Sequence, residues 1–272
     1  MDSPDRRAYS PCRRTGGDAG WIQRTRGRSG VKTIKTVIHI HTDYSPDSDI
    51  SAEHLAEYAD AHGVGCLAVT DHDEIEGALR VRQVANCHVI VGEEVTTRDG
   101  HLIGLFLHEW IPPGLSARVT AEEIRRQGGL VLLPHMEARV FGCGLREAAS
   151  QMVDLIDAVE VVNAQHLTRA PDRRADAFAR RHGLPRYVGS DAHLPCSIGP
   201  CYQELPPFET PDGFIESLRR ARLVPGYHPL LSYTIPMYLR AARYLFGLPF
   251  PAHVGVNSRR RRSQARAAVV AS

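Results

Sequence analysis

The chain has 272 residues, with 33 Lys and Arg residues against 31 Asp and Glu residues, and its formal net charge at pH 7 is +2. This length suits one main α/β domain with short appendages. No apolar run approaches the roughly 18 residues of a membrane-spanning helix, and the first residues are polar and rich in arginine. The pattern argues against membrane-spanning and secreted classes and predicts a cytoplasmic protein.

Charge is unevenly distributed along the chain. Twelve arginines and three acidic residues lie in residues 1–28 and 259–266, so these ends carry +9, whereas the remainder carries −7. The Arg, Gly and Ser composition predicts disordered basic segments at residues 1–33 and 256–272. Such ends can contact nucleic acid through sequence-independent charge. We expect solvated tails instead, because the Arg, Gly and Ser composition of the ends is typical of disordered segments. No pattern indicates the oligomeric state.

Short apolar or β-branched runs predict about seven strands, at residues 36–41, 66–70, 88–95, 101–107, 130–133, 156–162 and 187–189. Helical spacing lies between most of them, at residues 73–84, 120–127, 170–182 and 211–221, and Ser51 is a candidate helix N-cap. Strands that alternate with helices predict a parallel sheet, here closed into a barrel over residues 34–228. The short connection at residues 97–100 predicts one hairpin within it.

Residues 229–255 mix aromatic residues and leucines with two arginines. This pattern predicts a C-terminal helical segment that packs on the barrel, in preference to a helix lying on a membrane surface.

Metal-binding residue types stand at or just after the carboxyl ends of the predicted strands. They are His39, His41, His72, Glu94, His135, Asp191 and His193. His39 and His41 are one residue apart on a strand, so we expect both side chains on one side of it. The carboxyl ends of parallel barrel strands meet on one face, where active sites lie. Imidazole together with carboxylate suits Zn²⁺, Mn²⁺ or Fe²⁺, so the sequence predicts a metal site.

The same positions carry a family resemblance. The motifs are His39-Ile-His41-Thr, Thr70-Asp71-His72-Asp73, Gly92-Glu93-Glu94, Pro134-His135 and Gly189-Ser190-Asp191-Ala192-His193. In this order they resemble the motifs of the PHP (polymerase and histidinol phosphatase) family, over about residues 36–200. Residues 68–78 most resemble its stand-alone phosphoesterase branch, which includes nucleotide and nucleoside-bisphosphate phosphatases. The resemblance implies a distorted (β/α)7 TIM-like barrel that holds two or three divalent ions.

The resemblance also implies a set of nine ligands. One ion would be held by His39, His41, Glu94 and Asp191, a second by Glu94, His101 and His135, and a third by Asp47, His72 and His193. Three assignments have competitors in the sequence: Asp43 or Asp49 for Asp47, Glu93 for Glu94, and His108 for His101.

The implied activity is hydrolysis of a small phosphomonoester by a metal-activated water, with a nucleotide, nucleoside bisphosphate or amino-alcohol phosphate as substrate. Asp191, His193 and His72 are the candidate catalytic residues. The candidates for binding the substrate phosphate are Arg169, His166 and Arg139. Two alternatives stay open: a metal-dependent hydrolase of an amide or lactone, and a non-enzymatic module associated with nucleic acid.

Overall fold

A computed structural model describes residues 25–26, 32–138 and 143–229. Four predicted features lie wholly or mostly outside these residues. They are the basic tail, almost all of the C-terminal helical segment, most of the N-terminal extension, and Arg139. Within the described ranges no helix is long and apolar enough to cross a membrane.

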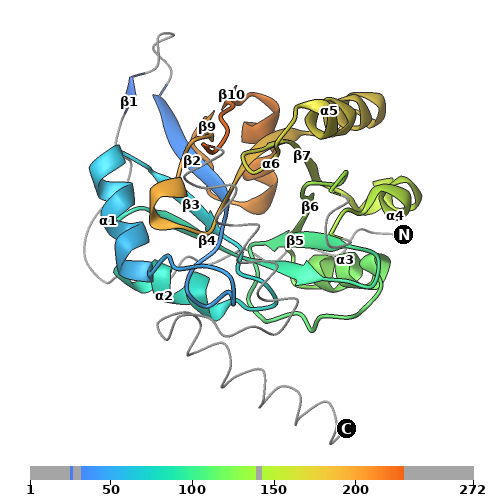
Figure 1. Ribbon diagram of the computed structural model, residues 1–272, viewed down its shortest axis with the longest axis horizontal. Helices are drawn as coiled ribbons and strands as arrows, with labels where there is room; N and C mark the ends of the chain where they lie inside the picture. Colours follow the sequence, from blue (N-terminus) through green and yellow to red (C-terminus); the bar gives the residue numbers. More distant parts are fainter. Residues whose placement is uncertain (1–24, 27–31, 139–142, 230–272) are drawn as a thin grey trace, which may run out of the picture.

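Seven strands close into a barrel in chain order (Figure 1). They are β2 (Lys32–Ile40), β3 (Cys66–Val69), β4 (His88–Thr96), β5 (His101–Leu105), β6 (Leu130–Leu133), β7 (Ala158–Asn163) and β8 (Arg186–Ala192). β8 pairs with β2 and closes the barrel. β5 is antiparallel to both of its neighbours, and the other barrel pairs are parallel. The predicted distorted (β/α)7 barrel and its hairpin are confirmed.

Helices cover the outside of the barrel (Figure 1). They are α1 (Ala52–His62), α2 (Glu76–Val84), α3 (Ala117–Arg126), α4 (Arg146–Gln151) and α5 (Ala170–His182), with 3₁₀ turns at Val153–Leu155 and Pro195–Ser197. Ser51 caps α1 as predicted, because its side chain accepts the backbone N–H of His54. Gly183 ends α5 in the left-handed conformation, which glycine adopts without a steric cost.

Alternation along the strands divides the core into two layers. One strand face, which includes Leu67 and Val131, packs with helix residues such as Leu55. The inner face packs with Phe214 of α6 (Pro211–Arg219), which is fully buried. Because the inner layer gathers near the starts of the strands, α6 closes the amino-terminal end of the barrel. Polar side chains occupy the carboxyl-terminal end of the barrel.

In the part of the chain that the structure describes, three short strands lie outside the barrel. β1 (Thr25–Arg26) pairs antiparallel with the start of β2, and β9 (Tyr202–Leu205) pairs antiparallel with β2 and with β10 (Arg222–Val224). β1 and the first two residues of β2 lie within residues 1–33, the segment that the sequence analysis predicts to be disordered. A two-residue strand pairs through backbone groups alone, so it leaves no apolar pattern in the sequence.

Candidate metal centre

The structure brings all nine predicted ligands together at the carboxyl end of the barrel. These residues, called the polar cluster below, are His39, His41, Asp47, His72, Glu94, His101, His135, Asp191 and His193. Their metal-binding roles stay predictions, but their convergence is a feature of the fold.

The backbone is irregular where β2 and β8 enter the polar cluster. The register of β2 against β3 and β8 shifts between Ile38 and Ile40, and His39 between them has a left-handed φ of 67°. Asp191 of β8 has a φ of 47°. Each such conformation costs about 1–3 kcal/mol in a non-glycine residue and is typical of functional sites. The irregularity places His39 Nε2 3.5 Å from Asp191 Oδ1.

His41 reaches the polar cluster in a way that simple alternation did not predict. β2 ends at Ile40, so His41 lies beyond the strand, and the bulge at His39 interrupts the alternation. The two imidazole rings still lie close, with centroids 5.2 Å apart. The expected proximity is therefore present, but a bulge and a loop produce it.

Glu94, on the inner face of β4, lies at the centre of the polar cluster. Its Oε1 lies 3.0 Å from His101 Nδ1 and 2.8 Å from His135 Nε2. Three further imidazole nitrogens surround its Oε2: Nε2 of His39 and of His41, each at 3.2 Å, and Nδ1 of His72 at 3.4 Å. One buried carboxylate thus offers each of its oxygens to a different set of imidazoles.

Two of the sequence alternatives concern residues beside the polar cluster. Glu93 points to the opposite face of β4, where its Oε2 accepts the backbone N–H of Ile111 at 3.0 Å. His108 is exposed, and its backbone N–H donates to Gln127. Glu94 and His101 are therefore the residues that contribute side chains to the polar cluster.

Asp47 is the aspartate of its loop whose carboxylate joins the polar cluster. Its Oδ2 lies 3.4 Å from His193 Nε2 and 3.6 Å from His72 Nε2. Asp43 and Asp49 support the loop through their backbone N–H groups, which donate to the carbonyls of Ile50 and His193.

Among the described residues, four groups of three side chains place donor atoms within 4.8 Å of one another. They are His41, His72 and His193; His39, His41 and Asp191; His39, Glu94 and His135; and His72, Glu94 and His101. In addition, His41 Nε2 is buried and makes no hydrogen bond within the described part of the chain. A buried imidazole nitrogen of this kind, with carboxylate oxygens nearby, fits a divalent cation. The donors therefore fit several metal sites.

Charge and burial set the protonation of the polar cluster. Burial raises the pKa of Glu94, but the positive charge of the surrounding histidines, His39 first, outweighs it and holds that pKa well below its usual range. Burial lowers the pKa of His193, yet Asp47 raises it to about 9. Burial, together with the positive charge of His193, lowers the pKa of His41 to about 4. Ionised carboxylates beside a neutral His41 favour a bound cation.

Asp71 supports the polar cluster from behind. It accepts hydrogen bonds from Thr42 N at 2.6 Å, Thr42 Oγ1 at 2.8 Å and Ser45 Oγ at 2.9 Å. Since Ser45 donates its proton to Asp71, its oxygen accepts from His41 Nδ1 at 3.2 Å. This chain of contacts favours the tautomer that leaves His41 Nε2 free to bind an ion.

Glu160 of β7 is a further residue of the site, which sequence reasoning missed. It is 2% exposed. Its Oε1 accepts from His39 Nδ1 at 2.8 Å, and its Oε2 accepts from His135 N at 2.7 Å and from Asn163 Nδ2 at 3.0 Å. Asn163 Nδ2 also donates to Asp191 Oδ2 at 2.9 Å. The signal in the sequence is a lone acid within an otherwise apolar strand.

The described candidates for substrate binding form a separate network on and beside the loop after β7. His166 Nδ1 donates to Asp172 Oδ1 at 2.6 Å, and Tyr227 Oη donates to Asp172 Oδ2 at 2.5 Å. The guanidinium of Arg169 lies 5.3 Å from the centroid of the Tyr227 ring. Asp172 Oδ1 also accepts from the backbone N–H of Asn163, at 3.3 Å. Asn163 therefore connects this network to the polar cluster.

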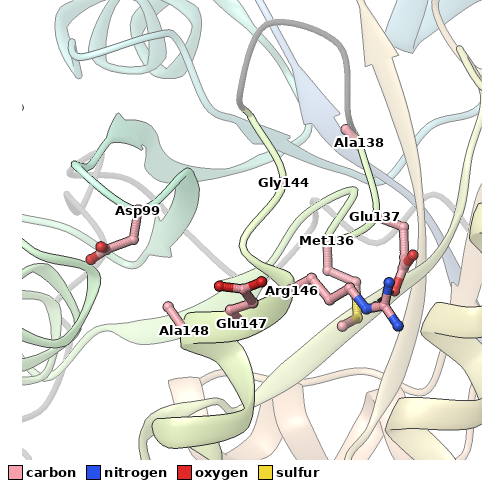
Figure 2. Close-up of a pocket in the computed structure, with 8 residues that line it drawn as sticks. All are labelled: Asp99, Met136, Glu137, Ala138, Gly144, Arg146, Glu147 and Ala148. Atoms are coloured by element: carbon pink, nitrogen blue, oxygen red, sulfur yellow. Dashed lines mark ion pairs between the residues drawn. The ribbon is translucent and has the colours of Figure 1, made fainter.

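A pocket of about 490 Å³ lies between Asp99, the residues that follow His135 and the start of α4 (Figure 2). Its lining residues are Asp99, Met136, Glu137, Ala138, Gly144, Arg146, Glu147 and Ala148. Arg146 Nε lies 3.3 Å from Glu137 Oε1, and Arg174 Nε lies 2.6 Å from Glu137 Oε2. None of the nine cluster residues lines this pocket, so we assign the site from the converging donors and not from the cavity.

Comparison with known proteins identifies related sequences. The model of the PHP domain matches residues 38–139, and the model of a PHP-associated region matches residues 171–223. An uncharacterised protein of Methanocaldococcus jannaschii is 35% identical over 147 residues, which are 49% of this chain and 84% of that protein.

Solved structures share the fold. A two-domain protein of Bacteroides vulgatus, described as containing a predicted PHP-like metal-dependent phosphoesterase, has a TM-score of 0.61 and 18% identity, covering 78% of this chain and 70% of that one. The lesion-specific endonuclease EndoQ of Pyrococcus furiosus has a TM-score of 0.54 and 17% identity, covering 70% of this chain and 57% of that one. At these identities the likeness concerns the fold alone. On its sequence matches, its closed seven-stranded barrel and its buried His, Glu and Asp groups, the chain belongs to the PHP family, with a PHP-associated region after the PHP domain.

Proposed function

We propose that this chain is a metal-dependent phosphoesterase that hydrolyses a small phosphomonoester. Glu94 carries the proposal, because its two oxygens face two different sets of imidazoles at 2.8–3.4 Å. A carboxylate in this position suits two cations held side by side, as in hydrolases that act on phosphate esters. The description of the Bacteroides vulgatus protein as containing a predicted phosphoesterase supports the same activity.

Two or three divalent ions fit the donors of the polar cluster. In this proposal the first would be held by His39, His41, Glu94 and Asp191, the second by Glu94, His101 and His135, and the third by Asp47, His72 and His193. Mixed imidazole and carboxylate donors suit Mn²⁺, Zn²⁺ and Fe²⁺ alike. When bound, such ions supply a water of lowered pKa and positive charge to neutralise phosphate oxygens.

The exposure of the side chains supports a substrate position on one side of the polar cluster. The side chains of His72 and Asp47 are 17% and 19% exposed, and that of Asp191 is 11% exposed, whereas His39 and His41 are at 0%. The open side therefore carries His72 and Asp191, with the buried His193 beside them. We assign proton holding and substrate orientation to His72, Asp191 and His193.

Arg169 and His166 bind the substrate phosphate in this proposal. Arg169 supplies positive charge on the loop after β7, and Asn163 connects that loop to Asp191. Burial lowers the pKa of His166, but the hydrogen bond to Asp172 and its charge outweigh this and raise that pKa. The protonated ring can donate to a phosphate oxygen from Nε2, which is buried and makes no hydrogen bond to another described residue. Arg139 remains a candidate outside the described residues.

The test is phosphate release by purified protein from nucleotides, nucleoside 3′,5′-bisphosphates and histidinol phosphate, with elemental analysis of the same samples. We expect a chelator to abolish turnover and Mn²⁺, Zn²⁺ or Fe²⁺ to restore it. Asp191→Asn, which keeps the side-chain size but removes the charge, should lose metal and turnover. Glu93→Gln, at the buried acid on the outer face of β4, should keep both.

The same experiment separates the alternatives. Metal-loaded protein that releases no phosphate but opens an amide or lactone would replace the phosphoester assignment. Salt-sensitive binding to DNA, with no hydrolysis under any of the three metals, would favour a nucleic-acid-associated module instead.

A further inference from the structure

We propose that Glu160 is a positioning residue that holds two separate parts of the polar cluster in metal-binding geometry, through the ring of His39 and the backbone of His135. The inference rests on the metal-binding part of the proposed function and is independent of which substrate is hydrolysed. Glu160 is not one of the nine predicted ligands, and it lies beneath them on the inner face of β7.

Three donors meet the two carboxylate oxygens of Glu160. Oε1 accepts from His39 Nδ1 at 2.8 Å, while Oε2 accepts from His135 N at 2.7 Å and from Asn163 Nδ2 at 3.0 Å. His39 and His135 contact opposite oxygens of Glu94, at 3.2 Å and 2.8 Å. One carboxylate therefore fixes ligands on both sides of Glu94.

The contact with His39 also selects a tautomer. A carboxylate can only accept, so His39 must carry its proton on Nδ1 when neutral. Its Nε2 then presents a lone pair toward Glu94 and Asp191, 3.2 Å and 3.5 Å away. Mutation of a carboxylate that orients a ligating imidazole in this way typically weakens metal binding by about 10–100-fold.

An amide of the same size cannot replace this carboxylate. Glutamine has one accepting oxygen and one donating NH₂ group. If the NH₂ group faces His135 N and Asn163 Nδ2, donors oppose donors. If it faces His39, it favours the tautomer protonated on Nε2, which cannot bind an ion through that atom. The first orientation leaves buried donors unsatisfied, and the second removes the lone pair of His39 Nε2.

Gly189 provides the space that Glu160 occupies. A Cβ atom at Gly189 would lie 1.6 Å from Glu160 Oε1 and 2.6 Å from its Cδ. Gly189 is not among the glycines with positive φ, so its backbone accepts alanine. Gly189→Ala therefore displaces the Glu160 carboxylate without altering any predicted ligand.

The experiment measures the dissociation constant of Zn²⁺ or Mn²⁺ by competition with a chelator. We expect Glu160→Gln to weaken binding by about 10–100-fold. The matched control is Glu93→Gln, because Glu93 is also a buried acid and burial raises its pKa well above the usual range. Replacing that acid by an amide removes little charge, and we expect its metal affinity to match the wild type.

A double-mutant cycle separates positioning from general damage to the fold. Gly189→Ala alone should weaken metal binding, whereas Gly189→Ala added to Glu160→Ala should weaken it no further, because the carboxylate it displaces is gone. Thermal unfolding of each variant confirms that the protein measured is folded.

NMR of the ring nitrogens of metal-free protein gives a readout without activity. We expect the Nδ1–H proton of His39, which donates to Glu160, to be protected from exchange with solvent in the wild type and to exchange faster in Glu160→Gln. If both Glu160→Gln and Gly189→Ala bind metal with wild-type affinity, the inference about Glu160 is wrong and the proposed function is unaffected. Wild-type protein that binds no metal refutes the proposed function, and the inference fails with it.

Discussion

Replacing Gly77 by alanine tests how Asp71 supports the polar cluster, because two effects of this change shift the free energy of unfolding in opposite directions. It is the second residue of α2, and a Cβ there would lie 2.0 Å from Asp71 Oδ2 and 2.3 Å from Thr42 Oγ1. In an unconstrained helix, Gly→Ala stabilises by about 1 kcal/mol. Here alanine must displace a buried carboxylate that accepts three hydrogen bonds.

The displacement outweighs the helix preference. A hydrogen bond to a charged group contributes about 1.5–3 kcal/mol, and overpacking costs about 1–3 kcal/mol. Loss of one such bond together with overpacking exceeds the gain from alanine. We expect Gly77→Ala to lower the free energy of unfolding by about 2–4 kcal/mol. Since Asp71 orients His41 through Ser45, metal affinity should fall as well.

Urea unfolding of metal-free protein measures this free energy. Gly213→Ala in α6 is the matched control, because the nearest atom to its Cβ would be Thr210 Oγ1 at 3.2 Å. We expect that change to stay within about 1 kcal/mol. If Gly77→Ala is as stable as the wild type, Asp71 is not held as described and the reasoning about its role fails.

Three further predictions concern the rest of the barrel. Burial lowers the pKa of His88 to about 4, below its unfolded value near 6.5, so the stability that depends on a neutral His88 is complete above about pH 6.5 and is lost as pH falls. Urea unfolding of metal-free protein at pH 7.5 and at pH 5 measures this loss, and the decrease in the free energy of unfolding should be about 2 kcal/mol smaller in His88→Leu than in the wild type. Phe214→Ala should lower the free energy of unfolding by about 3–5 kcal/mol, because this fully buried ring packs edge-on against Phe106 and Phe208; a cost under about 1 kcal/mol would contradict the closed amino-terminal end. Arg169→Met should raise KM for the phosphoester at least tenfold with metal content unchanged, and an unchanged KM would remove Arg169 from the phosphate site.

Much of the barrel could be predicted because its strands are buried on both faces. Such strands appear as continuous apolar runs, and the predicted runs overlap β2 to β8, with ends that differ by a few residues. The convergence of His72, His135 and His193 followed from the strand-end rule, since it needs only the direction of the strands. Alternation on β4 predicted that only one of Glu93 and Glu94 faces inward, and in the structure that residue is Glu94.

Other features depend on tertiary contacts that local patterns do not encode. The bulge at His39 arises from pairing with β3 and β8 at once. The residue type of Glu160 does not determine whether its side chain faces into the barrel or outward. Its role depends on a contact with His39, which is 121 residues away in the chain. β9 was missed because it includes the buried polar residue Gln203, which interrupts an apolar pattern. His166 was predicted as a phosphate ligand, but its partner Asp172 was not foreseen.

The most direct test of the central claim is the metal content of Glu94→Gln, measured by elemental analysis and set against its rate of phosphate release. Glutamine keeps the size of the side chain but cannot offer two accepting oxygens to the imidazoles on either side. We predict two or three ions per chain in the wild type, at most one in the variant, and loss of turnover. A variant that retains full metal content and wild-type turnover would contradict a metal centre bridged by Glu94.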